Sequence, residues 1–384
     1  MKLFKSLLVA PATLGLLAPL SATANEVTIN DFNPAEELAV TNSRVDGLEA
    51  RLNNFEAGGF TDTTTMSGTA AFLVGAEGKD GDAGEAAMFE YFYEVDLNTS
   101  FTGEDNLNVE FETGNASGSG VGATLDWGSG NGDVLKVTDV NYTFPVGEWT
   151  LAVGESMDAS ATFPNACAIS NTVDAIGDCG AGNSVALGGD VSFSASRGFG
   201  DGWAVGLGLS SDSGETTRGM FSEEGDDMYG VALGYEADTY GFTVAYSMIE
   251  STDLESGYVN TPAFDAADVQ TDSTYYGLVG YYSPESTPIT FSGGIELTDE
   301  EGTDVDKTQW SFGLTTDLGE GTLAATVGTV GAIAENADEL MAYDVSYAYP
   351  INDSMSITPF AYIVEQSGST EDTTGFGASV SFSF

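Results

Sequence analysis

The last twelve residues of the chain, TTGFGASVSFSF at 373–384, alternate strictly between apolar side chains and small or polar ones. Phenylalanine, alanine and valine share one face, and glycine and serine occupy the other. A period of two is that of a β-strand with one face in an apolar environment. Chain ends usually fray, so a strand that carries phenylalanine as its final residue, Phe384, is expected to be held in place. The apolar environment is either a protein core or lipid.

The composition excludes several classes of protein. The 384 residues hold 9 Lys and Arg against 60 Asp and Glu, which gives a net charge of −51. Nucleic-acid binding is excluded because no basic surface is available to meet phosphates. Histidine is absent, which excludes Ser-His-Asp and Cys-His catalysis and His-ligated zinc or haem. We therefore expect neither an enzyme nor a cofactor.

Residues 1–24 have the organisation of a secretory signal peptide. Two lysines precede an apolar run over 7–20, and Ala-Thr-Ala at 22–24 supplies a small-x-small cleavage site. The alternative is a membrane-anchoring helix, which Pro11 and Pro19 disfavour. We expect an exported chain.

The two cysteines, Cys167 and Cys179, are predicted to form a disulfide, because the exported chain reaches an oxidising compartment. Two free thiols are the alternative.

A segment over 25–60 precedes the alternating region. Within it, residues 35–57 are predicted to form a helix with apolar side chains at heptad spacing and charged residues between them. The seam consists of Leu38, Thr41, Val45, Leu48, Leu52 and Phe55. A short coiled coil that brings copies of the chain together is one interpretation, and a lone amphipathic helix is the other.

Residues 61–384 form the main domain, in which the period is two. About sixteen strands are predicted, at 65–75, 88–101, 105–114, 133–145, 148–156, 188–198, 202–211, 227–237, 240–250, 273–284, 288–297, 307–317, 321–331, 339–349, 353–365 and 373–384. Pro359 lies inside a predicted strand, where we expect a β-bulge.

The connections between these strands alternate between short turns and long acidic loops. That alternation is typical of a transmembrane β-barrel, with its turns at one end and its loops at the other. After residue 24 the sequence holds no long apolar helix, so a chain that spans a membrane does so as a closed barrel. The predicted fold is all-β: an antiparallel barrel of about sixteen strands, wide enough for an aqueous channel.

The sequence resembles the outer-membrane porins of marine cyanobacteria and, more loosely, the carbohydrate-selective porin family. The resemblance rests on the leader MKLFKSLLVAPATLGLLAPLSATA, on RVDGLEARLNNFEA running into TTTMSGTAAFLVGA, and on the GASVSFSF ending. It implies passive diffusion of small hydrophilic solutes, an outer-membrane location in contact with lipid and a homotrimer, with the helix at 35–57 in the periplasm. Phe384 resembles the terminal signal that the barrel-assembly machinery reads in porins. One departure is that NEVTINDFNPAEE stands where those porins usually carry an S-layer-homology domain.

Acidic side chains gather on the face predicted to line the channel. By strand parity they are Glu90, Glu94, Asp96, Glu110, Glu112, Asp139, Glu296 and Asp344. Lys136 falls on the opposite parity, so the carboxylates have almost no basic partner there. Uncompensated carboxylates in a pore concentrate cations and repel anions, which predicts a cation preference. The alternative is a solvated face without influence on selectivity.

The loop over 157–187 follows the fifth predicted strand and contains both cysteines. Its apolar residues favour packing against the barrel wall, and in sixteen-stranded porins the corresponding loop narrows the pore. Asp158, Asp174 and Asp178 would supply its charges. The alternative is a loop on the outer surface.

Two acidic stretches, GKDGDAGE and SEEGDD, contain carboxylates that loosely bound divalent cations would use. Neither matches a full cation-binding motif, and solvated surface loops are the preferred interpretation.

The competing hypothesis for the whole chain is a structural or adhesive acidic surface protein without a pore.

Overall fold

The computed structural model describes residues 63–79, 86–116, 120–127, 132–212, 214–216, 219–222, 226–251, 271–301, 306–366, 368 and 372–384. The chain divides into two units, Met1–Ala57 and Gly58–Phe384, and all described residues belong to the second. The predicted signal peptide and the helix at 35–57 lie outside them. None of the helices in the described part has the length and apolar character needed to cross a membrane.

Sixteen long antiparallel strands form the barrel wall over the described residues. They are β1 (Thr64–Lys79), β2 (Met88–Thr99), β3 (Asn106–Gly114), β4 (Lys136–Val146), β5 (Trp149–Glu155), β6 (Val191–Phe199), β7 (Trp203–Ser211), β8 (Asp227–Glu236), β9 (Tyr240–Ser251), β10 (Thr271–Tyr282), β11 (Ile289–Glu300), β12 (Lys307–Leu318), β13 (Gly321–Thr329), β15 (Met341–Asn352), β16 (Met355–Val364) and β17 (Thr373–Ser383). The two-residue strand β14 (Ile333–Ala334) pairs with the end of β12. Each predicted strand overlaps one of the sixteen, so the predicted fold class is confirmed.

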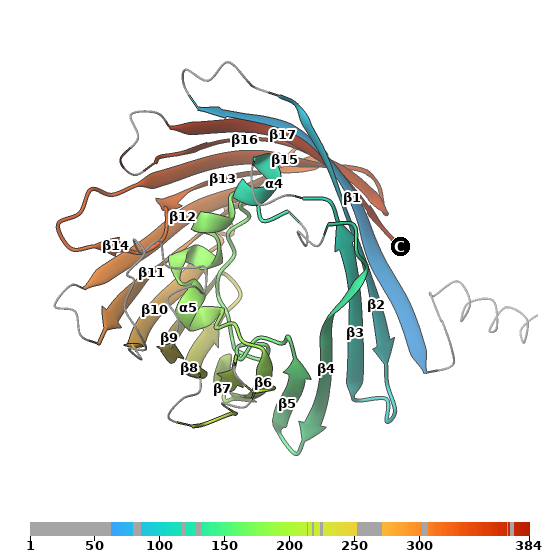
Figure 1. The fold of residues 1–384 in the computed structure, drawn as a ribbon, viewed down its shortest axis with the longest axis vertical. Coiled ribbons are helices and arrows are strands. Elements are labelled where there is room, and N and C mark those ends of the chain that lie inside the picture. The colour runs from blue at the N-terminus through green and yellow to red at the C-terminus, as the bar shows by residue number, and fades with distance from the viewer. Residues whose placement is uncertain are drawn as a thin grey trace, which may run out of the picture. The chain divides into compact units, whose positions relative to one another are not determined.

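The last strand closes the barrel, as Figure 1 shows, by pairing with the first from Thr69↔Ser383 to Lys79↔Thr373. The terminal residue extends this seam. Phe384 N donates to Gly68 O at 3.1 Å, and Gly68 N donates to Phe384 O at 2.9 Å. A Cβ at Gly68 would lie 2.7 Å from the Phe384 ring, so glycine there leaves the ring its space. Phe384 is therefore an ordered part of the wall.

The strands turn their apolar face out of the barrel and their polar face into it. Large apolar side chains that remain exposed on the outside include Phe72, Phe89, Leu207, Leu233, Val244, Leu278, Ile295, Phe312, Val345, Ile363 and Phe376. Buried polar side chains on the inward face include Ser192, Ser194, Ser210, Thr243, Ser247, Ser292, Glu296, Ser311, Thr326, Asp344 and Ser346. A water-soluble domain distributes its side chains the other way round. The apolar face of the last strand thus points outward from the barrel.

The predicted bulge at Pro359 is wrong. Pairing between β16 and β17 runs through Pro359↔Ala378 without a shift, and the irregularity lies on β15, between Pro350 and Asn352. Pro359 has no N–H to donate, and the ladder to β15 passes from Ser346↔Phe360 to Tyr349↔Ile357 without it. A proline can thus sit inside a strand where no donor is required.

Candidate functional site

The connection between β5 and β6 folds into the barrel, where it forms three short helices: η2 (Asp174–Ile176), η3 (Asp178–Gly180) and α5 (Gly182–Val185). Figure 1 shows these helices within the ring of strands. The α5 helix contacts β8 to β11, η3 contacts β11 and β12, and η2 contacts β13. We call residues 157–187 the inner loop. It covers the inside of a large part of the barrel wall.

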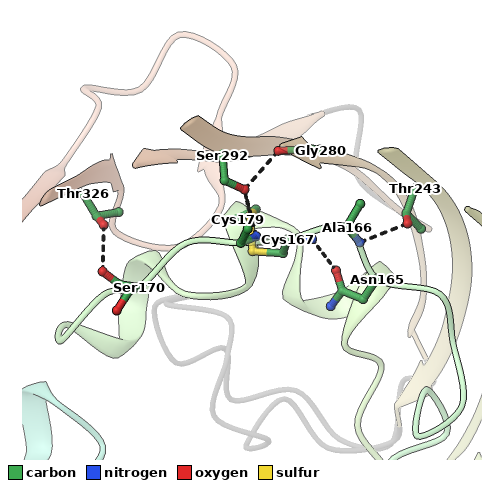
Figure 2. Close-up of a disulfide and its surroundings, with 10 residues drawn as sticks. Asn165, Ala166, Cys167, Ser170, Cys179, Thr243, Gly280, Ser292 and Thr326 are labelled. Carbon is green, nitrogen blue, oxygen red and sulfur yellow. Dashed lines mark hydrogen bonds between the residues drawn. A yellow bond between two sulfur atoms is a disulfide. The ribbon is translucent and has the colours of Figure 1, made fainter. Parts of the chain in front are cut away.

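Cys167 and Cys179 form a disulfide within the inner loop, which confirms the predicted bridge. Figure 2 shows wall hydroxyls on both sides of this bridge. Ala168 N donates to Ser292 Oγ at 2.8 Å, and Ala166 N donates to Thr243 Oγ1 at 3.1 Å. The bridged turn is therefore held to β9 and β11 by hydrogen bonds from its backbone.

Small residues on the wall let the inner loop approach closely. A Cβ at Gly206 would lie 2.7 Å from the Phe163 ring, and one at Gly208 would lie 2.2 Å from the Ala159 carbonyl oxygen. Glycine at these inward positions of β7 thus makes room for the first half of the loop.

Two wall carboxylates hold the rest of the inner loop. Asp344 Oδ2 accepts hydrogen bonds from Thr172 N at 2.6 Å, Thr172 Oγ1 at 3.2 Å and Val173 N at 3.0 Å. Glu296 accepts from Ser184 Oγ at 2.6 Å and from Asn183 Nδ2 at 2.9 Å. Charge-assisted hydrogen bonds of this kind are among the stronger ones in proteins.

Three of the eight predicted channel-lining acids are covered by other parts of the protein, whereas the other five are half-buried. The side chains of Glu296, Glu90 and Asp344 are only 0%, 3% and 6% exposed. The inner loop covers Glu296 and Asp344. Glu90 lies under Gly122, a residue of the short helix α4 (Val121–Thr124), where a Cβ would be 2.1 Å from Glu90 Oε2. Strand parity predicts the face on which a residue lies, but it does not predict which loop covers that face.

The other five acids lie together on the inward face of β2, β3 and β4. We call Glu94, Asp96, Glu110, Glu112 and Asp139 the acidic wall. Each is half-buried, and they stand opposite one another across the strands as Glu94↔Glu112, Asp96↔Glu110 and Glu110↔Asp139. Cross-strand partners project on the same side, so their charges accumulate on one surface.

Side chains beside the acidic wall use their donors to support its carboxylates. Asn108 Nδ2 donates to Asp96 Oδ1 at 2.9 Å, and Thr138 Oγ1 donates to Glu110 Oε1 at 2.8 Å. Asn141 Nδ2 donates to Asp139 Oδ2, also at 2.9 Å. Neutral donors of this kind orient a carboxylate and leave its charge in place.

The predicted orientation of Lys136 is wrong. The pairing of β3 with β4 shifts between Glu110 and Phe111, so that Thr138 is an extra residue and Lys136 stands opposite Glu112. Lys136 therefore projects inward beside the acidic wall. Beyond a β-bulge, the side chains of a strand alternate in the opposite sense. The prediction for Lys136 assumed an uninterrupted alternation and therefore assigned it to the wrong face.

The three predicted charges of the inner loop, Asp158, Asp174 and Asp178, have exposed side chains, but protein of the barrel and loop surrounds them on several sides. This partial removal from water raises the pKa of all three carboxyls. The neighbouring Asp178 carboxylate adds to the rise at Asp158, and Asp126 and Asp178 add to it at Asp174.

A cavity of about 340 Å³ lies between the acidic wall and the start of the inner loop. Its lining includes Asp139, Asn141, Thr143, Ser156 and Asp158. Within the described residues, no group of three or more histidine, cysteine, aspartate or glutamate side chains is arranged to hold a metal ion.

Comparison with solved structures finds several proteins with a similar fold. The chain matches OprB of Pseudomonas putida with a TM-score of 0.61 at 10% identity, covering 88% of this chain and 97% of that one. It matches an anion-selective porin of Comamonas acidovorans with a TM-score of 0.57 at 12% identity, covering 84% and 99% of the two chains. A loop-deletion variant of OmpT, an outer-membrane protein of Vibrio cholerae, gives a TM-score of 0.56 at 12% identity, covering 84% of this chain and all of that one.

Sequence comparison adds a distant relative. An uncharacterized protein of Nostoc sp. is 26% identical over 405 residues, which covers 88% of this chain and 69% of that protein. No protein-family profile matches the chain. Polar side chains face the inside of the barrel, apolar side chains cover its outside, and the similar solved structures share this fold. The chain is therefore a porin-like sixteen-stranded β-barrel.

Proposed function

We propose that this protein is an outer-membrane channel for the passive diffusion of small hydrophilic solutes and ions, and that it prefers cations. The observation that carries the proposal is the acidic wall, which remains half-exposed inside a barrel whose other side is covered by the inner loop. Carboxylates that line a confined aqueous path raise the local concentration of cations and repel anions.

The described basic side chains leave most of this charge uncompensated. Arg197 pairs with Glu148, and Lys307 pairs with Glu300. Lys136 is the one described basic residue that stands opposite a member of the acidic wall. One lysine among five carboxylates leaves a net negative surface.

An outer-membrane location is supported by the exposed apolar surface of the barrel and by the length of its strands. Most strands have 9 to 12 residues, and a tilted strand of about 9–11 residues crosses the hydrocarbon layer. The same proposal includes a signal peptide over 1–24, a periplasmic segment over 25–60 with a helix that supports a homotrimer, and recognition of Phe384 by the barrel-assembly machinery. Carbohydrate selectivity and a marine cyanobacterial origin remain predictions from the sequence resemblance.

Planar-bilayer recording of the purified protein under a KCl gradient tests the proposal. The informative variant is E94Q/E110Q/E112Q, which neutralises three carboxylates and keeps their shapes. The matched control is E285Q/E320Q/D353N, because these three carboxylates are exposed in turns. We expect stepwise conductance and a cation-selective reversal potential for the natural protein and the control, and a potential closer to zero for the first variant.

The other outcomes are distinct. An anion-selective potential in the natural protein would retain the channel and refute the role of the acidic wall. A folded protein that gives no conductance steps would favour the structural or adhesive surface protein.

A further inference from the structure

A second connection also enters the barrel. The described residues 120–127, which we call the α4 segment, belong to the connection between β3 and β4 and contain helix α4. Figure 1 shows α4 inside the ring of strands, and α4 contacts β1. Val121 is fully buried, so the segment is packed against other protein.

Wall residues hold the α4 segment at two points. Thr124 Oγ1 donates to Glu77 Oε2 at 2.6 Å, and the Tyr362 hydroxyl donates to the same oxygen at 2.6 Å. At the second point the backbone of Gly122 lies directly on the Glu90 carboxylate, so that a larger residue would require the carboxylate or the segment to shift. The contacts come from β1 and β2 on one side of the barrel seam and from β16 on the other, where β17 lies between β16 and β1.

The α4 segment also meets the inner loop. Val121 belongs to one buried apolar cluster with Val173 and Ile176 of the inner loop and with Leu73 and Tyr362 of the wall. Val173 is the residue whose N–H is bound by Asp344. The middle of the inner loop, around η2, is therefore held between the wall and the α4 segment.

We propose that the α4 segment is a second constriction element, which narrows the lumen beside β1 and β2 and holds the η2 part of the inner loop, so that its residues help set the size limit for solutes. This inference rests on the proposed channel function. It assigns a role in size selection to residues outside the inner loop, and it predicts that loosening α4 widens the path even though the inner loop keeps its sequence.

The test is the exclusion size of the open channel, measured in planar bilayers with neutral polyethylene glycols of increasing mass. G122V places a side chain where the Glu90 carboxylate lies, which disrupts the contact between the α4 segment and β2. The matched control is G198V on β6, where a Cβ would meet nothing closer than the Trp203 carbonyl oxygen at 3.8 Å. A helical turn with its side chains is about 10 Å across, so we expect its displacement to raise conductance at least about 1.5-fold and to admit larger polymers.

Two further variants keep the test decisive if G122V does not fold. V121A reduces the packing against the inner loop, and T124V removes the hydroxyl that binds Glu77. Each is expected to shift the polymer limit in the same direction by a smaller amount. A natural channel whose polymer limit is the same in all folded α4 variants would overturn the inference, whereas a natural protein without conductance would refute the channel itself.

Discussion

Replacing Asp344 with alanine is the most direct perturbation of the inner loop. Its carboxylate accepts two backbone N–H groups, from Thr172 and Val173, and the side chain is 6% exposed. Removing the acceptor leaves these donors without their partner, at a cost of about 1–3 kcal/mol for each buried donor. We therefore expect the docked state of the loop to lose about 2–6 kcal/mol for the two donors.

Hydrogen exchange measures this loss where it occurs. Exchange through local opening follows the opening equilibrium, and each 1.4 kcal/mol changes an equilibrium about tenfold. In D344A, amides of peptides covering residues 168–178 should exchange about 30-fold faster or more, while those of β16 and β17 keep their protection. The control is D353A, which removes an exposed carboxylate in a turn. Unchanged exchange of residues 168–178 in folded D344A would refute the anchoring role of Asp344.

Other expected outcomes concern the inner loop and the barrel seam. Removing the disulfide in C167S/C179S, which closes a separation of 12 residues, should weaken loop docking by about 2–4 kcal/mol, seen as faster exchange in the inner loop with unchanged barrel melting. The pKa values of the three inner-loop aspartates are raised above the ordinary 3.8, so these groups bind protons more readily in the docked loop than in the released loop. Docking should strengthen as pH falls toward 3.8 and weaken as pH rises through the raised values. Cation selectivity should decline as pH falls, starting above 3.8, and reversal potentials measured along a pH series check the sign. Deleting Phe384 removes two backbone hydrogen bonds to Gly68 and should cost about 1–3 kcal/mol, visible as a lower unfolding temperature of the barrel on semi-native gels.

The strands were predictable because a barrel between apolar and polar surroundings imposes one rule on every strand. Alternation identified each of the sixteen, including the terminal one, and the disulfide was predicted from the two cysteines and the expectation that the chain is exported. The two-residue strand β14 escaped, since two residues cannot show a period.

The interior was less predictable, because loop packing depends on contacts between residues far apart in the sequence. Glu296 and Glu94 both alternate with apolar neighbours, yet the inner loop covers the first and leaves the second half-exposed. The α4 segment gave no sequence signal, since four helical residues show no periodicity. Inward serine and threonine residues on the strands that face the loop, such as Ser292 and Thr243, were the signal available: they are the acceptors that an incoming backbone needs.

The bulge in β4 shows how local backbone geometry determines the charge of a surface. If the pairing continued regularly through Thr138, Val137 would stand opposite Glu112 and project inward, and Lys136 would project from the outer face. A lysine on a lipid-facing surface costs up to about 2–4 kcal/mol, depending on its depth. With the bulge, Val137 stands opposite Phe111 on the outside and Lys136 stands opposite Glu112 on the inside. The bulge thus removes a cationic group from the apolar surface and adds one positive charge beside the five carboxylates. If Lys136 offsets part of their field, K136Q should make the reversal potential more cation-selective, opposite in sign to the change in E94Q/E110Q/E112Q.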